Sequence, residues 1–121
     1  MVIAERILQI EGADGLTRVA VRLHAPEPRQ GYWACRSEIH WPERVRTLET
    51  GGHDAVQALY LAMQMIGTEL YFNAHDEPGR LAFWGDWKGY GFPLPSNLRD
   101  DEIGADDRYY LTGTGAPNEA D

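Results

Sequence analysis

Long apolar runs, paired cysteines and strong positive charge are all missing from this 121-residue sequence. No stretch approaches the roughly 20 apolar residues that cross a bilayer, and Glu5 and Arg6 interrupt the N-terminal segment where a signal peptide would be apolar. The single cysteine, Cys35, rules out an internal disulfide, so folding does not require an oxidising compartment. We therefore expect a cytoplasmic protein without a membrane partner.

Basic residues are outnumbered, with 11 lysines and arginines against 19 acidic residues and a net charge of −8. Binding to nucleic-acid phosphates needs a basic stripe, so a nucleic-acid partner is not expected. The acidic excess gathers in residues 97–121, which contain seven acidic and two basic residues, a net charge of −5. The sequence predicts one domain over residues 1–96, long enough to bury its own core, followed by a flexible acidic tail over 97–121.

Spacings that mark catalytic or metal sites are missing too. The four histidines form no i, i+4 pair on a helix and no Cys-x-x-Cys pair occurs, so neither a metal nor a cofactor is predicted. Cys35 and His40 resemble a nucleophile and its base, but strand alternation places them on opposite faces of a sheet. We expect Cys35 to be a buried structural cysteine, assign no catalytic residue, and favour a non-enzymatic protein.

Alternation of apolar and polar residues predicts β-strands in the first half of the chain. Residues 18–24 and 33–41 alternate with period two, residues 2–10 are rich in aliphatic side chains, and residues 44–50 form a weaker run. The turn from Gly12 to Gly15 makes the first two strands a hairpin. A further short strand is expected over 80–84. The connections favour an antiparallel meander of three or four strands.

The period changes after Gly51 and Gly52, and residues 55–72 contain no proline, which predicts one long helix. Asp54 and Gln57 form a capping pair at its start. One helix face would pack across the sheet, giving an α+β fold, and carries Leu59, Met63, Ile66 and Leu70. A second apolar edge needs cover from another part of the chain, and it consists of Leu61, Met65 and Phe72.

Residues 83–95, FWGDWKGYGFPLP, combine five aromatic rings with glycines and prolines that prevent regular structure. We name this segment the aromatic ribbon. Its rings carry too much apolar area to stay in water, Trp84, Trp87, Tyr90 and Phe92 among them. We expect the ribbon to fold as a lid over the second helix edge. A self-association surface and the lip of a small-molecule site remain as alternatives, because exposed apolar patches mark interfaces and ligand sites.

Basic side chains gather on one predicted sheet face. If the strands over 18–24 and 33–41 pair, the face away from the helix carries Arg18, Arg22, His24, Arg36 and His40, with Arg6 as a neighbour. Guanidinium groups bind carboxylates and phosphates through paired hydrogen bonds, so this face is a candidate surface for an anion or a partner. The alternative is an ordinary solvated face, with its arginines bridged to Glu38 or to the acidic tail.

Three motifs resemble those of a known family: Trp33-Ala34-Cys35 on a strand, the Gly51–Ala62 helix start, and Gly91-Phe92-Pro93. The chain is similar, over roughly residues 3 to 95, to small uncharacterised bacterial proteins grouped as a domain of unknown function. The resemblance implies that the domain spans about these residues. It implies no activity.

Together these features favour a small non-enzymatic interaction or regulatory module, with another protein or a second copy of the chain as its partner. The alternative is a protein that binds a small anionic ligand, or acts on one, with the arginine-bearing face.

Overall fold

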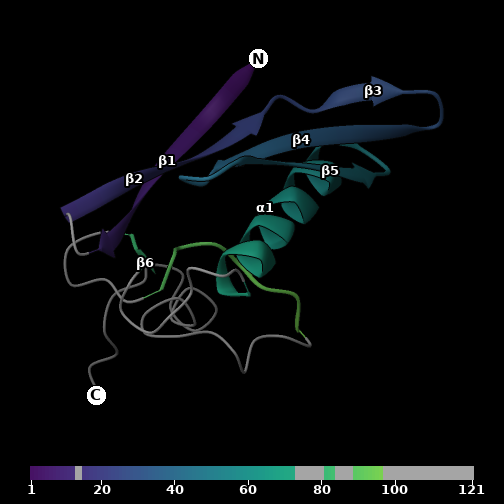
Figure 1. Cartoon of the computed structure of the whole chain (residues 1–121). Coiled ribbons are helices and arrows are strands. Elements are labelled where there is room, and N and C mark those ends of the chain that lie inside the picture. Colours follow the sequence, from purple (N-terminus) through teal and green to yellow (C-terminus); the bar gives the residue numbers. More distant parts are fainter. Residues whose placement is uncertain (13–14, 73–80, 84–88, 97–121) are drawn as a thin grey trace.

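The structure, a computed structural model, describes residues 1–12, 15–72, 81–83 and 89–96. It contains one helix and six strands in the order β1 (Val2–Gly12), β2 (Gly15–His24), β3 (Glu27–Arg29), β4 (Tyr32–His40), β5 (Val45–Gly52), α1 (Ala55–Tyr71) and β6 (Leu81–Ala82). The strands form a single antiparallel sheet, and α1 lies across one face of it (Figure 1). The predicted α+β class is therefore confirmed.

The sheet is larger than the three or four strands expected. Strands β1, β2, β4 and β5 follow one another as the predicted meander, while β3 and β6 extend it. β3 pairs with the start of β4 through a tight turn in which Gly31 adopts a positive φ of 86°. β6 pairs with β1 at Gln9 and Ile10, a contact between segments some seventy residues apart that strand periodicity does not reveal.

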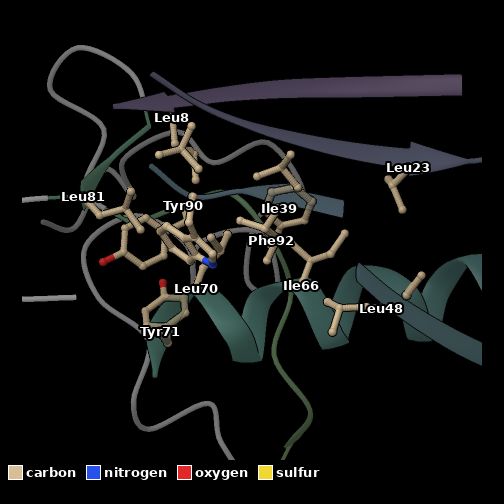
Figure 2. Packing of buried hydrophobic residues seen from close by; sticks show 14 of the residues in the cluster. Leu8, Leu23, Ile39, Leu48, Ile66, Leu70, Tyr71, Leu81, Tyr90 and Phe92 are labelled. Carbon is tan, nitrogen blue, oxygen red and sulfur yellow. The ribbon is translucent and has the colours of Figure 1, made fainter. Parts of the chain in front are cut away.

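The pairing register decides which side chains enter the core. On β1 and β2, Leu8, Val19 and Val21 point toward the helix and are buried, while Glu5 and Arg22 face each other on the outer side. Ile39 of β4 and Leu48 of β5 continue the inner layer between the sheet and α1 (Figure 2). A register shift near Ala4 is the only irregularity between the described parts of β1 and β2.

The start of α1 follows the predicted capping pattern. The Gln57 backbone N–H donates to the Asp54 carboxylate at 2.7 Å, and the His53 N–H donates to the Gln57 side-chain oxygen at 2.6 Å. These bonds satisfy amides that the first turn leaves unpaired. Thr50 of β5 adds a bond from its hydroxyl to the Ala58 carbonyl at 3.0 Å. The capping prediction is confirmed, and the helix begins where β5 ends.

The buried face of α1 is rotated from the one expected. Its centre consists of Ala58, Ala62, Ile66 and Leu70, whereas Leu59 and Met63 are only partly buried. Alanine at two of these positions lets the helix backbone approach the sheet closely. Gly52 contributes to the same approach, because a Cβ at that position would overlap the backbone of Ala58. The periodicity located the helix, and close packing selected its face.

The described part of the aromatic ribbon enters the core. Tyr90, Phe92 and Leu94 are all buried, and the Tyr90 and Tyr71 rings lie 4.7 Å apart between centroids. The ribbon passes α1 at Gly67, where a Cβ would overlap the Pro93 carbonyl oxygen. Its route therefore runs along the Gly67 and Tyr71 side of the helix. Trp84 and Trp87 lie outside the described residues.

Cover over the second helix edge is partial among the described residues, where Pro95 of the ribbon lines one groove together with Leu61 and Met65. Met65 is 40% exposed and Phe72 is 58% exposed, while Leu61 is partly buried. The physical reason is that glycine at position 67 offers the ribbon a closer approach on the adjacent side of the helix. Within the described part of the chain, Met65 and Phe72 of this edge thus stay exposed.

Arg6 also lies on the opposite side from the one expected. It points into the core side of the sheet, where its guanidinium stacks between the rings of Phe83 and Phe92, at 4.2 and 4.8 Å from their centroids. It donates to the carbonyl oxygens of Gly91 at 2.6 Å and Tyr90 at 3.3 Å. Cation–π stacking and charge-assisted hydrogen bonds together hold the ribbon against β1.

Candidate interaction surfaces

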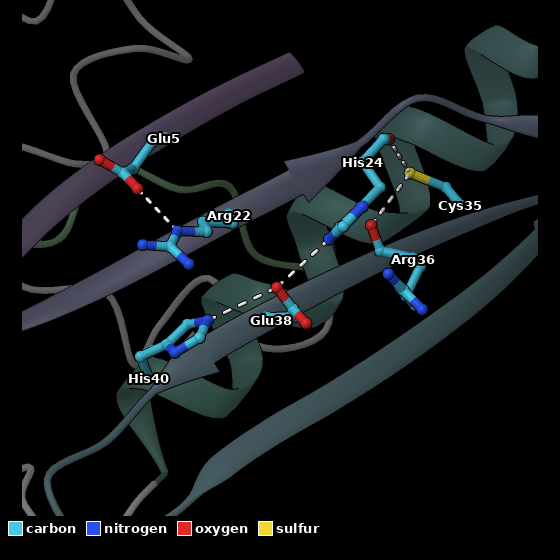
Figure 3. A network of polar contacts seen from close by, with 7 residues as sticks. All are labelled: Glu5, Arg22, His24, Cys35, Arg36, Glu38 and His40. Atoms are coloured by element: carbon cyan, nitrogen blue, oxygen red, sulfur yellow. Dashed lines mark hydrogen bonds and ion pairs between the residues drawn. The ribbon is translucent and has the colours of Figure 1, made fainter. Parts of the chain in front are cut away.

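The outer face of the sheet carries the basic residues singled out in the sequence. β2 pairs with β4 through Arg22 opposite Glu38 and Ala20 opposite His40, so Arg22, His24, Arg36 and His40 share this face (Figure 3). Arg22 Nε donates to the Glu5 carboxylate of β1 at 2.7 Å. The charge of Arg22 is therefore matched within the sheet.

Glu38 lies between two histidines. Its Oε1 is 3.2 Å from His24 Nε2 and 3.5 Å from His40 Nε2 (Figure 3). The hydrogen bond from His24, with a further one from His40, lowers the pKa of Glu38 below its ordinary value against the opposing effect of burial. Both imidazoles of this face are thus engaged with one carboxylate.

The arginines of the outer face do not converge. Arg18 is four residues along β2 from Arg22 and lies opposite Gln9 of β1. Since strand residues rise by about 3.3 Å each, roughly 13 Å separates the two backbone positions. Arg36 lies opposite Glu49 of β5. The sheet distributes its positive charges along the face and places carboxylates beside most of them.

A small hollow of about 130 Å³ lies on this face beside β3. Its lining includes His24, Arg29 and Arg36, which favour an anion, and also Glu27 and Glu49, which oppose one. Arg29 donates to Glu27 at 2.8 Å and lowers the pKa of that carboxyl. The hollow is small and its charges are balanced.

Cys35 is fully buried on the inner face, as predicted. Its thiol donates to the backbone oxygen of His24 at 3.4 Å, and burial raises its pKa. A raised pKa disfavours the thiolate that nucleophilic chemistry requires. His40 points to the other face of the same strand, so the two side chains form no nucleophile–base pair.

The solvent-facing side of α1 combines exposed apolar side chains with uncharged polar ones. Met65 is 40% exposed and Phe72 is 58% exposed, and at 100° per residue the two lie within about 20° of each other around the helix. Glu69 is the only charged residue between positions 55 and 72, and it turns away to receive a bond from Arg46 of β5 at 3.1 Å. We name this surface the uncharged helix face, defined by Leu61, Gln64, Met65, Thr68 and Phe72, which lie within about 100° around α1.

A groove of about 530 Å³ runs between this face and β5. Leu61, Gln64, Met65 and Thr68 form its helix side, and Pro95 of the aromatic ribbon also lines it. The opposite wall is residues 49–51 of β5, whose single charge is Glu49. Within the described part of the chain, β5 pairs with β4 alone, so this wall is a strand edge.

Sequence reasoning identified Leu61, Met65 and Phe72 and did not bring forward the exposed Val56 and Tyr60. Val56 and Tyr60 lie outside the two apolar stripes that the helical period selected, so periodicity did not bring them forward. The informative signal was the lack of charge along the helix, where Glu69 is the single charged residue between positions 55 and 72.

Comparison with known protein families gives one result. Residues 4–94 match the model of a family described as a domain of unknown function, DUF6968. The chain belongs to this family. The DUF6968 match spans β1 through Leu94, so it includes the sheet, the helix and the buried end of the ribbon. No curated protein and no solved structure matches the chain. Family membership therefore leaves the function unknown.

Among the described residues, no helix is both long and apolar enough to cross a membrane.

Proposed function

We propose that this chain is a non-enzymatic interaction module that docks a partner protein on the uncharged helix face and its groove. The observation that carries the proposal is the exposure of Met65 and Phe72, beside Leu61, on a helix side without charge. The solvent-facing side of an ordinary surface helix carries charged and polar residues. The centres of protein interfaces are instead depleted in charge and enriched in aromatic residues and methionine.

The groove supports the same function. A partner side chain placed between α1 and β5 would contact Leu61 and Met65 on one side and the edge of β5 on the other. Apolar surface removed from water stabilises such a complex by about 25 cal/mol per Å² before the costs of association. The strand edge adds backbone groups that an extended partner segment could pair with.

The experiment is a comparison of Met65→Asp with Thr47→Asp in the full chain. Met65 lines the groove, whereas Thr47 is an exposed residue of β5. Size-exclusion chromatography with light scattering and a pull-down from lysate should show association of the wild type and of Thr47→Asp, and its loss in Met65→Asp. A strictly monomeric wild type that retains no partner would contradict the proposal.

Binding of a small anion on the arginine-bearing face is the second candidate. Arg29 and Arg36 beside the hollow favour it, but Glu27 and Glu49 line the same hollow and Arg22 is bound to Glu5. A thermal-shift screen with inorganic phosphate and citrate tests it directly, because a ligand at 100 times its dissociation constant adds about 2.7 kcal/mol of stability. Stabilisation lost in Arg36→Gln would favour this candidate over the interaction module.

We also propose a cytoplasmic location. The lone Cys35 is buried as a thiol, and a fold that needs no disulfide suits a reducing compartment.

A further inference from the structure

β5 forms one edge of the sheet, and its sequence does little to prevent another strand from pairing there. Within the described part of the chain it pairs with β4 alone, in one continuous register over all 8 of its residues. Natural sheets protect exposed edges with proline, lysine or a bulge. β5 contains neither proline nor lysine, and Arg46, one of its two charged residues, is held by Glu69 of α1 at 3.1 Å. Every second residue of β5 therefore directs its backbone N–H and C=O groups away from β4, toward an unprotected edge.

The groove between α1 and β5 lies where a further strand would be added. Neighbouring strands are about 4.8 Å apart, so a strand beside β5 would run along the groove wall formed by residues 49–51. α1 packs on β4 and β5 (Figure 1), and its Leu61 and Met65 line the same groove. The inward side chains of an added strand would contact these two residues, as the inward side chain of Leu48 in β5 contributes to the core under the helix.

The charges near the groove are negative. Glu49 is exposed and is the single charged residue of the groove lining, and Arg36 of β4 lies opposite it on the side away from the edge. Residues 97–121, which begin two positions after Pro95 of the lining, have a net charge of −5. Opposite charges attract each other across neighbouring strands and between whole molecules. The site therefore favours a basic strand, and the same charges disfavour a second copy of this acidic chain.

We propose that the occupant of the groove is an extended, basic segment of a partner protein, which adds to the sheet as a strand at the edge of β5. The inference rests on the proposed function and names the class of partner. Apolar side chains at alternate positions enter the groove beside Leu61 and Met65, and basic side chains at the other positions lie beside Glu49 on the outer face. Backbone hydrogen bonds to β5 supply affinity, and the two rows of side chains supply specificity.

The experiment measures binding of a fluorescein-labelled peptide of about six residues, alternating valine and lysine, to the full chain by fluorescence anisotropy. We expect saturable binding that weakens with salt, and about tenfold weaker binding of a matched peptide with glutamate in place of lysine. Two further peptides carry N-methyl groups on the lysine amides or on the valine amides. Since only one alternate set of amides faces the neighbouring strand, one of these two peptides should lose binding and the other should keep it.

Glu49→Lys should reverse the preference between the lysine and glutamate peptides, because it replaces the carboxylate beside the added strand with an ammonium group. Glu11→Lys is the matched control, since it makes the same change in net charge at an exposed position of β1, which does not pair with β5. It should keep the preference of the wild type, and the thermal midpoints of both variants confirm that they fold.

Three results would overturn the inference through the peptides and Glu49. They are the absence of saturable binding by the valine–lysine peptide, equal binding of the two N-methylated peptides, and an unchanged preference in Glu49→Lys. Tighter binding of the valine–lysine peptide to a chain without residues 97–121 would identify that segment as the occupant instead. A dimer that the peptide dissociates would identify a second copy. The proposed function is judged separately, because it stands if Met65→Asp abolishes the capture of a partner protein, even where no peptide binds.

Discussion

Glu38 illustrates how one side chain depends on two neighbouring strands. Its carboxylate accepts hydrogen bonds from His24 of β2 and from His40 of its own strand, and these bonds lower its pKa. A carboxyl with a lowered pKa in the folded state contributes stability above its ordinary pKa. That contribution is lost as the pH falls through the folded-state pKa.

We predict that Glu38→Gln reduces the loss of unfolding free energy that the wild type shows as the pH falls into the acid range. Near pH 7 the free energy of unfolding of the variant should be lower than that of the wild type by up to about 1 kcal/mol, as for the loss of a partly exposed ion pair. Between about pH 5 and pH 3 the wild type should lose this advantage. Urea unfolding at a series of pH values measures the effect. Glu49→Gln, on the same face, controls for the loss of one negative charge. A Glu38→Gln variant that loses as much unfolding free energy on acidification as the wild type would refute the prediction.

Gly67 is a second residue with a specific structural role. Elsewhere in a helix, replacing glycine by alanine stabilises by about 1 kcal/mol. Here the added Cβ would overlap the carbonyl oxygen of Pro93, so we predict that Gly67→Ala destabilises by about 1–3 kcal/mol, as overpacking does. Gly51→Ala is the control, because its Cβ would make only a 3.4 Å contact with the Tyr32 ring. Equal midpoints in urea for the two variants would show that the ribbon does not pack on Gly67.

At the scale of elements, the helix is defined by its first turn and by the strand before it. Asp54 caps the first amides, Gln57 returns the bond to His53, and Thr50 bonds Ala58 across the end of β5. Each partner is within eight residues of the other in sequence, which is why a local pattern was enough to predict the start of α1.

Replacing the cap tests this account. Asp54→Ala should lower the free energy of unfolding by about 1 kcal/mol, because the amide of Gln57 loses its acceptor. Asp54→Asn keeps an acceptor oxygen in place and should change the stability by a few tenths of this amount. Urea denaturation followed by circular dichroism at 222 nm provides the measurement. An alanine variant as stable as the asparagine variant would show that the cap does not limit the stability of α1.

At the scale of the whole molecule, the sheet has two different faces. One is covered by α1 and the buried end of the aromatic ribbon, and the other carries ion pairs such as Arg22 with Glu5. All buried hydrophobic residues of the described chain lie between Leu8 and Leu94, and the family match ends at residue 94. Both limits agree with a domain that ends near residue 96, which stays a prediction.

Removal of residues 97–121 tests the domain boundary. The shortened chain loses the acidic segment, so its net charge changes from −8 to −3. We expect a free energy of unfolding within about 0.5 kcal/mol of the full chain, as for changes outside the core. Urea unfolding of the two forms provides the comparison. A loss of several kcal/mol would show that residues beyond 96 contribute to the core.

The sequence by itself determined the strands, the helix and its cap. Alternation along β2 and β4, and the Asp54–Gln57 pair, depend on residues close together in the chain, so local pattern is enough to predict them. The same holds for the inward position of Cys35, which follows from counting along one strand. It also placed Arg22, His24 and His40 on one face, because period two leaves no other side for them.

Only the tertiary structure decided which of these side chains have partners and where α1 is open. The stacking of Arg6 between Phe83 and Phe92, the pairing of β6 with β1 and the approach of Pro93 to Gly67 all join residues far apart in sequence. Such contacts depend on shape and close packing, which leave no periodic pattern in the sequence. The same packing sent the ribbon along one side of the helix and left Met65 and Phe72 in solvent.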